Sequence, residues 1–529
     1  MGVRAICAWS MGLLALCAMP AAGGDHKWIK AETPHFTILS DSSAKTVSGY
    51  ALKLEQYHYV LAGFYGLSPE ADAELPKLRL YFVNDPLDMK QAWPNIPMDV
   101  AGWYKACTEG QVAVAAGGYE KIKSSQKLED QTQNDSQTIL FHEYTHTFMF
   151  QVTDTRYPAW FVEGFAEYYG TTRIGDGEAL VGMAWQDRVD RLLTDGYGMP
   201  YDAMLRDKPD LHANPTKEDE FYAQSWVLTH WIMSDPTRRA QFGAYVKAIN
   251  GGADPVAAFE SIMGVKVADL ERLMRAYLHH MQAQAYRVDN MPTPNIAITT
   301  MPASADKLMM WDAALRMCPA KADWAGLTSN VTAEAAKFPG DDFAQTTLAR
   351  LQIEIGDETQ GLPYLTNYTA KHPDDAEAAY MLGQAWYLSF TNGRTIAGET
   401  KATELQKART WLGKAYTLDP LNAADLYYFA LSQQDQPGYP DDNALTSAVQ
   451  AHDLAPSVSS YALLAAELLV ETGDMQTAKT MLYPLASNPH GGAIRSWASG
   501  IITAIDNGAS KDEVLKLMRT QSDSKGDDK

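Results

Sequence analysis

Cysteine, histidine and positive charge are all scarce in this chain of 529 residues. It contains 4 cysteines and 12 histidines, and 44 basic residues stand against 65 acidic ones, for a formal net charge of −21 at pH 7. Proteins that bind nucleic acid or anionic membranes need a surplus of Lys and Arg, so this balance argues against both partners.

Long hydrophobic runs are also missing, with one exception at the N-terminus. Residues 5–19 form an apolar stretch that follows Arg4 and precedes the small residues of 20–24. The stretch is too short to span a bilayer and is typical of a bacterial secretory signal peptide, which we assign to 1–22. We therefore predict an exported protein, periplasmic or extracellular, with no membrane span.

Removal of the signal peptide takes away two cysteines and leaves Cys107 and Cys318. In an oxidising compartment these two could form a disulfide, but cysteines so far apart could equally stay free. Because the chain contains no C-x-x-C spacing, neither is expected to bind zinc.

The most informative motif is H-E-x-x-H at His142, Glu143 and His146. On a helix, residues i and i+4 lie on one face, so both imidazoles can bind one metal ion while Glu143 reaches a water molecule on it. Apolar residues flank the motif, which indicates a helix buried deeply enough to shield the ion from bulk water.

A second segment offers the third ligand that catalytic zinc generally requires. Glu163 lies seventeen residues after His146, in an apolar stretch that we expect to be a helix beginning after Pro158. Glu167 follows one turn later on the same face, where its carboxylate could accept the free ring N–H of a ligating histidine.

The segments 142–146 and 158–168 together resemble the gluzincins, metallopeptidases in which a glutamate from a following helix completes H-E-x-x-H, often within Glu-Gly-x-Ala. The likeness is closest to the bacterial peptidase MA-like branch, and residues 222–226 add a weaker match. The resemblance implies an α+β zincin-like catalytic domain, a Zn²⁺ cofactor and a peptide or protein substrate.

The resemblance also implies the roles of individual residues. His142, His146 and Glu163 would be the zinc ligands, with Glu167 behind them. Glu143 would be the general base that takes a proton from the attacking water and passes it to the leaving amine.

Gluzincins commonly supply an oxyanion donor from a later helix, and Tyr222 in the helical stretch 220–233 is our candidate. An ordinary core aromatic is the alternative, since this stretch also contains Phe221 and Trp226. His230, two turns further on, is a second candidate donor.

Upstream, 35–40, 78–83 and 111–116 have the composition of short strands, and 44–64 has helical spacing. We expect 111–116 to be the edge strand that holds substrate, because it comes last before the zinc helix, with an ordinary hairpin strand as the alternative.

Gly117 and Glu120 match part of a Gly-x-x-Glu element that recognises the free amine of substrates in gluzincin aminopeptidases. They are therefore possible substrate-binding residues. A simple glycine turn is the favoured explanation, so exopeptidase activity stays a minority alternative.

A linker at 288–295 follows a helical run expected to end around Tyr286, so we place the catalytic domain at 27–290. Beyond it, Ala-rich helical pairs with proline spacings of 34, 47 and 36 residues resemble a degenerate tetratricopeptide array over 300–515. Such an all-α solenoid could bind a protein partner, with bundle packing as the alternative. Residues 521–529 form a polar tail predicted to be disordered.

These observations predict a zinc metallopeptidase. Two other classes remain open. The chain could be a binding or scaffold protein that acts through its helical repeats, with a silent zinc site or with no zinc. It could also be a zinc hydrolase of non-peptide amides such as cell-wall cross-links, which would use the same ligands.

Overall fold

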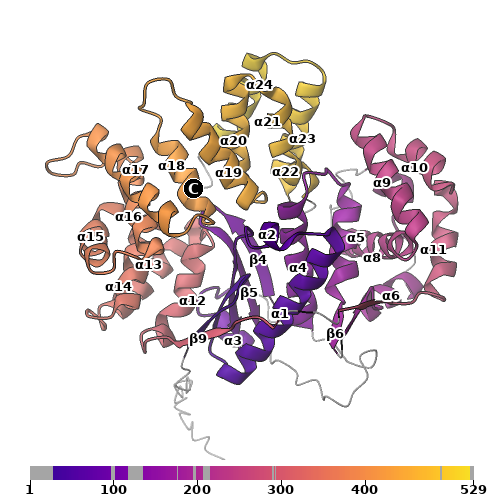
Figure 1. Cartoon of the computed structure of the whole chain (residues 1–529), viewed down its shortest axis with the longest axis horizontal. Coiled ribbons are helices and arrows are strands. Elements are labelled where there is room, and N and C mark those ends of the chain that lie inside the picture. Colours follow the sequence, from indigo (N-terminus) through magenta and orange to yellow (C-terminus); the bar gives the residue numbers. More distant parts are fainter. Residues whose placement is uncertain are drawn as a thin grey trace, which may run out of the picture.

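A computed structural model describes residues 28–524, apart from 97–101, 117–134, 176, 195–197, 207–214, 289–290, 292 and 489–490. The protein is mixed α/β, with a sheet built mainly from the N-terminal part and a C-terminal region made of helices (Figure 1). No helix in the described residues is long and apolar enough to cross a membrane. The predicted signal peptide lies outside them.

The main sheet has six strands in the order β4-β5-β3-β2-β1-β9. β2 and β3 pair in parallel, as do β3 and β5, whereas the other neighbours are antiparallel. The predicted strands correspond to β2, β3 and β5, but β5 is internal and β4 is the edge strand. The strands are β1 (Ile29–Glu32), β2 (Phe36–Ser40), β3 (Leu78–Val83), β4 (Gly102–Cys107), β5 (Gly110–Ala116) and β9 (Ala297–Thr300).

Alternating side chains bury both faces of this sheet, because successive residues of a strand point to opposite sides. One face packs on α1 (Ala44–Tyr65) and α4 (Asp135–Val152) through residues such as Leu80 and Ala113. The other packs through Tyr81 and Val114 on the first helices of the C-terminal region. The two predicted domains therefore share a core, and β9 returns to the sheet after the predicted linker.

The remaining elements of the first part lie beside the sheet, with α8 to α11 at the right of Figure 1. A small second sheet has the order β6-β7-β8. The expected helical run to Tyr286 is wrong at its end, because α11 stops at Leu278 and β8 pairs with β7. The elements are α2 (Pro69–Asp72), α3 (Pro86–Met89), α5 (Ala159–Gly170), β6 (Arg173–Gly175), β7 (Glu178–Val181), α6 (Gln186–Thr194), α7 (Tyr201–Leu205), α8 (Pro215–Met233), α9 (Pro236–Asn250), α10 (Pro255–Met263), α11 (Leu270–Leu278) and β8 (Gln284–Arg287).

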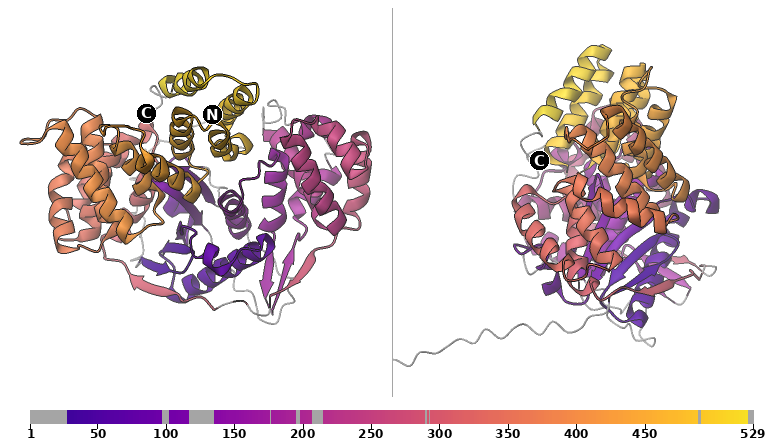
Figure 2. Two further views of the ribbon diagram at one scale, coloured as in Figure 1. Left: turned by 45° about the horizontal axis from the view of Figure 1, so that its top comes forward. Right: turned by 90° about the vertical axis from the view of Figure 1, so that its left-hand side faces the viewer.

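From residue 305 onwards the described chain is helical, and consecutive helices such as α16 to α20 pack on each other. We call α12 to α24 the helical region; it curves around the sheet in Figure 2. The last helix reaches Ser524 and so covers part of the predicted disordered tail. The helices are α12 (Ala305–Arg316), α13 (Lys321–Ala335), α14 (Asp342–Glu354), α15 (Leu362–Lys371), α16 (Ala376–Thr391), α17 (Lys401–Leu418), α18 (Ala423–Ser432), α19 (Asp442–Leu454), α20 (Ser459–Thr472), α21 (Met475–Met481), α22 (Tyr483–Ser487), α23 (Gly492–Asp506) and α24.

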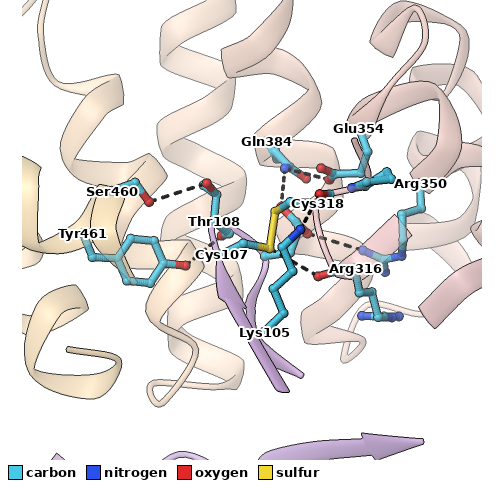
Figure 3. Close-up of a disulfide and its surroundings, with 12 residues drawn as sticks. Lys105, Cys107, Thr108, Arg316, Cys318, Arg350, Glu354, Gln384, Ser460 and Tyr461 are labelled. Atoms are coloured by element: carbon cyan, nitrogen blue, oxygen red, sulfur yellow. Dashed lines mark hydrogen bonds and ion pairs between the residues drawn. A yellow bond between two sulfur atoms is a disulfide. The ribbon is translucent and has the colours of Figure 1, made fainter. Parts of the chain in front are cut away.

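The turn of the β4–β5 hairpin is anchored in the helical region. Glu109 at this turn accepts hydrogen bonds from Tyr380 Oη (2.8 Å) and Gln384 Nε2 (2.7 Å), and its carboxylate lies 3.6 Å from Arg350 Nη1. Tyr461 Oη donates to the carbonyl of Thr108 at 2.8 Å, as Figure 3 shows.

A disulfide fixes the same junction. Cys107 at the end of β4 is bonded to Cys318, just after α12 (Figure 3). Lys105 adds a hydrogen bond from Nζ to the carbonyl of Cys318, at 2.9 Å. The two cysteines that the sequence left open are therefore paired, which is consistent with an exported protein.

Candidate metal centre

Two neighbouring helices bring the predicted ligands together. His142 and His146 lie on one face of α4, and Glu163 faces them from α5. The two Nε2 atoms are 3.1 Å apart, and the Glu163 carboxylate lies 3.3 Å from Nε2 of His142 and 3.5 Å from Nε2 of His146. All three side chains are buried.

This geometry suits a tetrahedral metal ion. Ligand atoms at bonds of about 2.0–2.1 Å from such an ion are about 3.3–3.4 Å apart, and the three observed separations bracket that value. The Glu163 side chain is 0% exposed, and a buried carboxylate needs a positive partner. Burial alone would lower the pKa of His142, but Glu163, Glu167 and Glu143 raise it above its ordinary value, so the site attracts positive charge.

Glu143 has a different environment from the ligands. It is only half-buried, and with His146 and Thr147 it lines a cavity of about 370 Å³. Residues 102–106 of the edge strand β4 line the same cavity. Glu143 and His146 both border this cavity, but Glu143 is the more exposed of the two, whereas His142, His146 and Glu163 are buried.

A glycine explains how α5 comes so close to its neighbours. A Cβ atom at Gly164 would lie 2.2 Å from Thr229 Oγ1 and 2.3 Å from the carbonyl oxygen of Ser225, both on α8. Only glycine allows this packing. The Glu-Gly sequence therefore places a ligand on one face of α5 while the next residue lets α8 pack on another.

The face of α4 away from His142 and His146 is held by α1. Tyr57 Oη donates to the carbonyl of Phe141 (3.1 Å) and lies 2.5 Å from Thr145 Oγ1. His58 Nδ1 pairs with Tyr144 Oη at 2.6 Å. These buried contacts fix the rotation of α4 and hence the direction of its two metal-site histidines.

Glu167 lies behind the cluster but binds a different partner from the one predicted. Arg188 of α6 donates to both of its oxygens, from Nε at 3.2 Å and from Nη2 at 2.8 Å. The Nδ1 atom of His142 is 3.8 Å from Glu167 Oε1, which is beyond hydrogen-bond length. Arg188 belongs to no sequence motif, so its contact with Glu167 was not predicted.

The two candidate oxyanion donors have distinct surroundings. Burial raises the pKa of Tyr222 above its usual range, and so do the charges of Glu163, Glu218, Glu167 and Glu143. Its Oη donates to Glu218 Oε1 at 3.5 Å. His230 is fully buried and pairs with Tyr277 Oη (2.7 Å) and the carbonyl of Gly182 (2.9 Å). The hydrogen-bonding pattern of His230 is that of a core residue.

A second group of ionisable side chains was also missed. His35 and His58 stack with ring centroids 3.5 Å apart, and both pair with Asp72. His35 Nδ1 pairs with Glu55 at 2.8 Å, and His58 contacts Tyr144 as described above. Each ring nitrogen thus has a protein partner, so this group forms a hydrogen-bonded network.

One further prediction falls outside the described residues, and another is wrong. Gly117 and Glu120 lie outside them. The expected edge strand 111–116 is wrong, because β5 has β4 and β3 as neighbours and the free edge belongs to Gly102–Cys107.

A family model described as a protein of unknown function (DUF1570) matches residues 136–253. This segment contains α5, α8 and most of α4, and hence the complete His142–His146–Glu163 cluster together with Tyr222. No curated protein matches the chain.

Proposed function

We propose that the protein is an exported zinc metallopeptidase that hydrolyses peptide bonds. The observation that carries the proposal is the enclosed His142, His146 and Glu163 cluster beside a cavity that Glu143 lines. A site that only stored a metal ion would need the three ligands but would have no use for a carboxylate at the cavity.

Zinc is the ion that this donor set favours. Two imidazole nitrogens and one carboxylate oxygen at tetrahedral spacing are typical of catalytic zinc sites, which keep the fourth position for water. Bound there, zinc would lower the pKa of that water and polarise the substrate carbonyl.

The residues of the chain would divide the remaining chemistry. Glu143 would accept the proton of the attacking water and transfer it to the leaving nitrogen. Tyr222 would donate its phenolic proton in a hydrogen bond to the developing oxyanion, and its raised pKa keeps that proton in place. Arg188 would hold Glu167 on the far side of His142.

We extend the proposal to the two halves of the chain. The sheet with α4 and α5 suits a gluzincin-like catalytic domain over 27–290, and α12 to α24 suit a tetratricopeptide-like array over 300–515. Pairwise packing of successive helices and the proline spacings support the second assignment.

Hydrolysis of a mixed peptide library tests the proposal. The mature protein loaded with zinc is compared with Glu143→Gln and His146→Ala, and the metal content of each is measured. We expect cleavage only by the parent, with zinc kept in Glu143→Gln and lost in His146→Ala. His372→Ala is a control, because this histidine is exposed and distant from the cluster.

Absence of cleavage by a parent that holds zinc would contradict the proposal and redirect attention to non-peptide amides or to a binding role. Full zinc in His146→Ala would contradict the ligand assignment itself.

A further inference from the structure

The cavity beside Glu143 is shared between the two halves of the chain. Besides β4 and α4, it is lined by Ser457, in the turn before α20, and by Asn488, just after α22. Two residues of the helical region thus border the same space as Glu143 and His146.

A second cavity of about 310 Å³ adjoins the first. Phe150 lines both, and the second cavity is lined by Pro456 and Ser487, the chain neighbours of Ser457 and Asn488. We call the two cavities together the groove. It follows α4 from Glu143 to the loop 153–155, and α19, α21 and α22 contribute residues to its far part.

A buried histidine lines the far part of the groove. His452 is 4% exposed, and its Nδ1 lies 3.3 Å from Asp453 Oδ1. Its Nε2 has no hydrogen-bond partner among the residues that the structure describes. Since a buried polar atom without a partner is costly, this nitrogen favours a ligand that brings a hydrogen-bonding group.

A disulfide and several hydrogen bonds join the two sides of the groove. The Cys107–Cys318 disulfide and the Glu109 contacts tie the β4–β5 hairpin to α14 and α16. Gln151 Nε2 of α4 also donates to the carbonyl of Leu454 at 3.2 Å. The helical region is therefore a permanent side of the groove.

We infer that the groove binds an extended polypeptide segment on one side of the scissile bond, so that the substrate is an unfolded chain cut internally. The inference rests on the proposed peptidase function. His146 and Val152 are six residues apart on α4, a rise of about 9 Å, which an extended peptide covers in about three residues. A substrate must therefore extend about three or four residues beyond the cleaved bond to reach His452.

A series of peptides tests this inference. All share one cleavable centre and are lengthened residue by residue on either side. We expect kcat/KM of the zinc-loaded protein to rise about tenfold when the extension on one side reaches three or four residues. Thr155→Trp fills the far cavity from an exposed position and should reduce the ratio of long-peptide to short-peptide kcat/KM to about one.

Thr237→Trp is the matched control, because Thr237 is exposed on α9 and lines neither cavity. The parental ratio should persist in it. Equal rates for all lengths in the parent, or an unchanged ratio in folded Thr155→Trp, would overturn the groove while leaving the peptidase proposal intact. Failure to cleave any peptide would overturn both.

A binding assay gives a readout that does not depend on turnover. The longest peptide should bind to Glu143→Gln, and adding Thr155→Trp should weaken this binding about tenfold.

Discussion

The side chain of Glu143 is more exposed to solvent than those of the three candidate metal ligands, and this difference fits their proposed roles. His142, His146 and Glu163 are enclosed, which would keep water from competing for a bound ion and strengthens each electrostatic contact. Glu143 is the most accessible of the four. A base must exchange protons with substrate and solvent, so a position at the cavity suits its proposed task better than burial would.

Replacing Tyr222 by Phe removes only the phenolic oxygen, so it tests whether that hydroxyl stabilises the transition state. We expect Tyr222→Phe to retain zinc and substrate binding but to lower kcat about a hundredfold, because loss of one oxyanion donor costs that much in comparable sites. Steady-state kinetics with measured zinc content checks this. Tyr416→Phe, at an exposed tyrosine of α17, is the control. A decrease of less than about threefold would assign Tyr222 to packing alone.

The sequence identified the metal cluster because its spacing is local. His142 and His146 are one helical turn apart, and Glu163 follows in the next helix. The sequence did not predict the roles of Arg188, Tyr57 or the hydrogen-bonded group of His35, His58, Asp72 and Glu55, which we call the His35 network. These roles depend on contacts between residues far apart in the chain. A single arginine or tyrosine on an amphipathic helix does not indicate its partner.

At the scale of elements, the contact between α5 and α8 decides whether Glu163 reaches the histidines. We expect Gly164→Ala to destabilise the protein by about 1–3 kcal/mol, because the added methyl group overlaps Ser225 and Thr229. It should also weaken zinc binding by displacing Glu163.

Thermal unfolding with and without a chelator measures both effects. Gly243→Ala is the control within helix α9, where a Cβ would meet no described atom within 4 Å. That substitution should be neutral or stabilising. Equal stability of the two variants would refute the packing argument.

The His35 network should make the free energy of unfolding depend on pH. Burial alone would lower the pKa of His35, but its hydrogen bonds to Asp72 and Glu55 raise it to about 9. A pKa raised on folding contributes stability that is fully present below the unfolded value of about 6.5 and is lost as the pH rises towards 9. We expect a loss on the order of 2 kcal/mol across this window.

Denaturant unfolding at intervals from pH 6 to pH 9.5 measures the loss. Glu55, Asp72 and His58 surround the His35 ring, and Tyr144 faces His58 from α4. His35→Gln keeps hydrogen-bonding capacity without the titration, so the difference between the parent and this variant should shrink with rising pH. A difference that is constant over the window would contradict the assignment.

Hydrophobic periodicity correctly predicted the longer strands and helices but did not predict the strands of only four residues. The expected strand 78–83 and helix 44–64 are confirmed almost residue for residue. β1 and β9 have only four residues each, and β8 was read as the end of a helix. Such segments become strands because a neighbouring strand pairs with them, which local sequence does not reveal.

At the scale of the whole molecule, the sequence indicated two domains but not that they share a hydrophobic core on one face of the sheet. The helical region covers one face of the sheet and holds the β4–β5 hairpin among α14, α16 and α20. These contacts join residues more than 200 positions apart, so no local pattern could predict them. The helical region thus binds a turn of its own chain, and a separate protein partner for it stays a prediction.

The Cys107–Cys318 disulfide should therefore contribute to stability and to the placement of the edge strand. It closes a loop of 211 residues, and loss of such a crosslink costs about 2–5 kcal/mol. We expect the Cys107→Ser, Cys318→Ser double variant to unfold at a lower temperature. It should also cleave long peptides less well, because β4 borders the groove.

Reductant should shift the parent towards this behaviour and leave the double variant unchanged. An effect of reductant on both proteins would show that it acts elsewhere, and no effect of the double substitution would mean that the Glu109 contacts alone hold the hairpin.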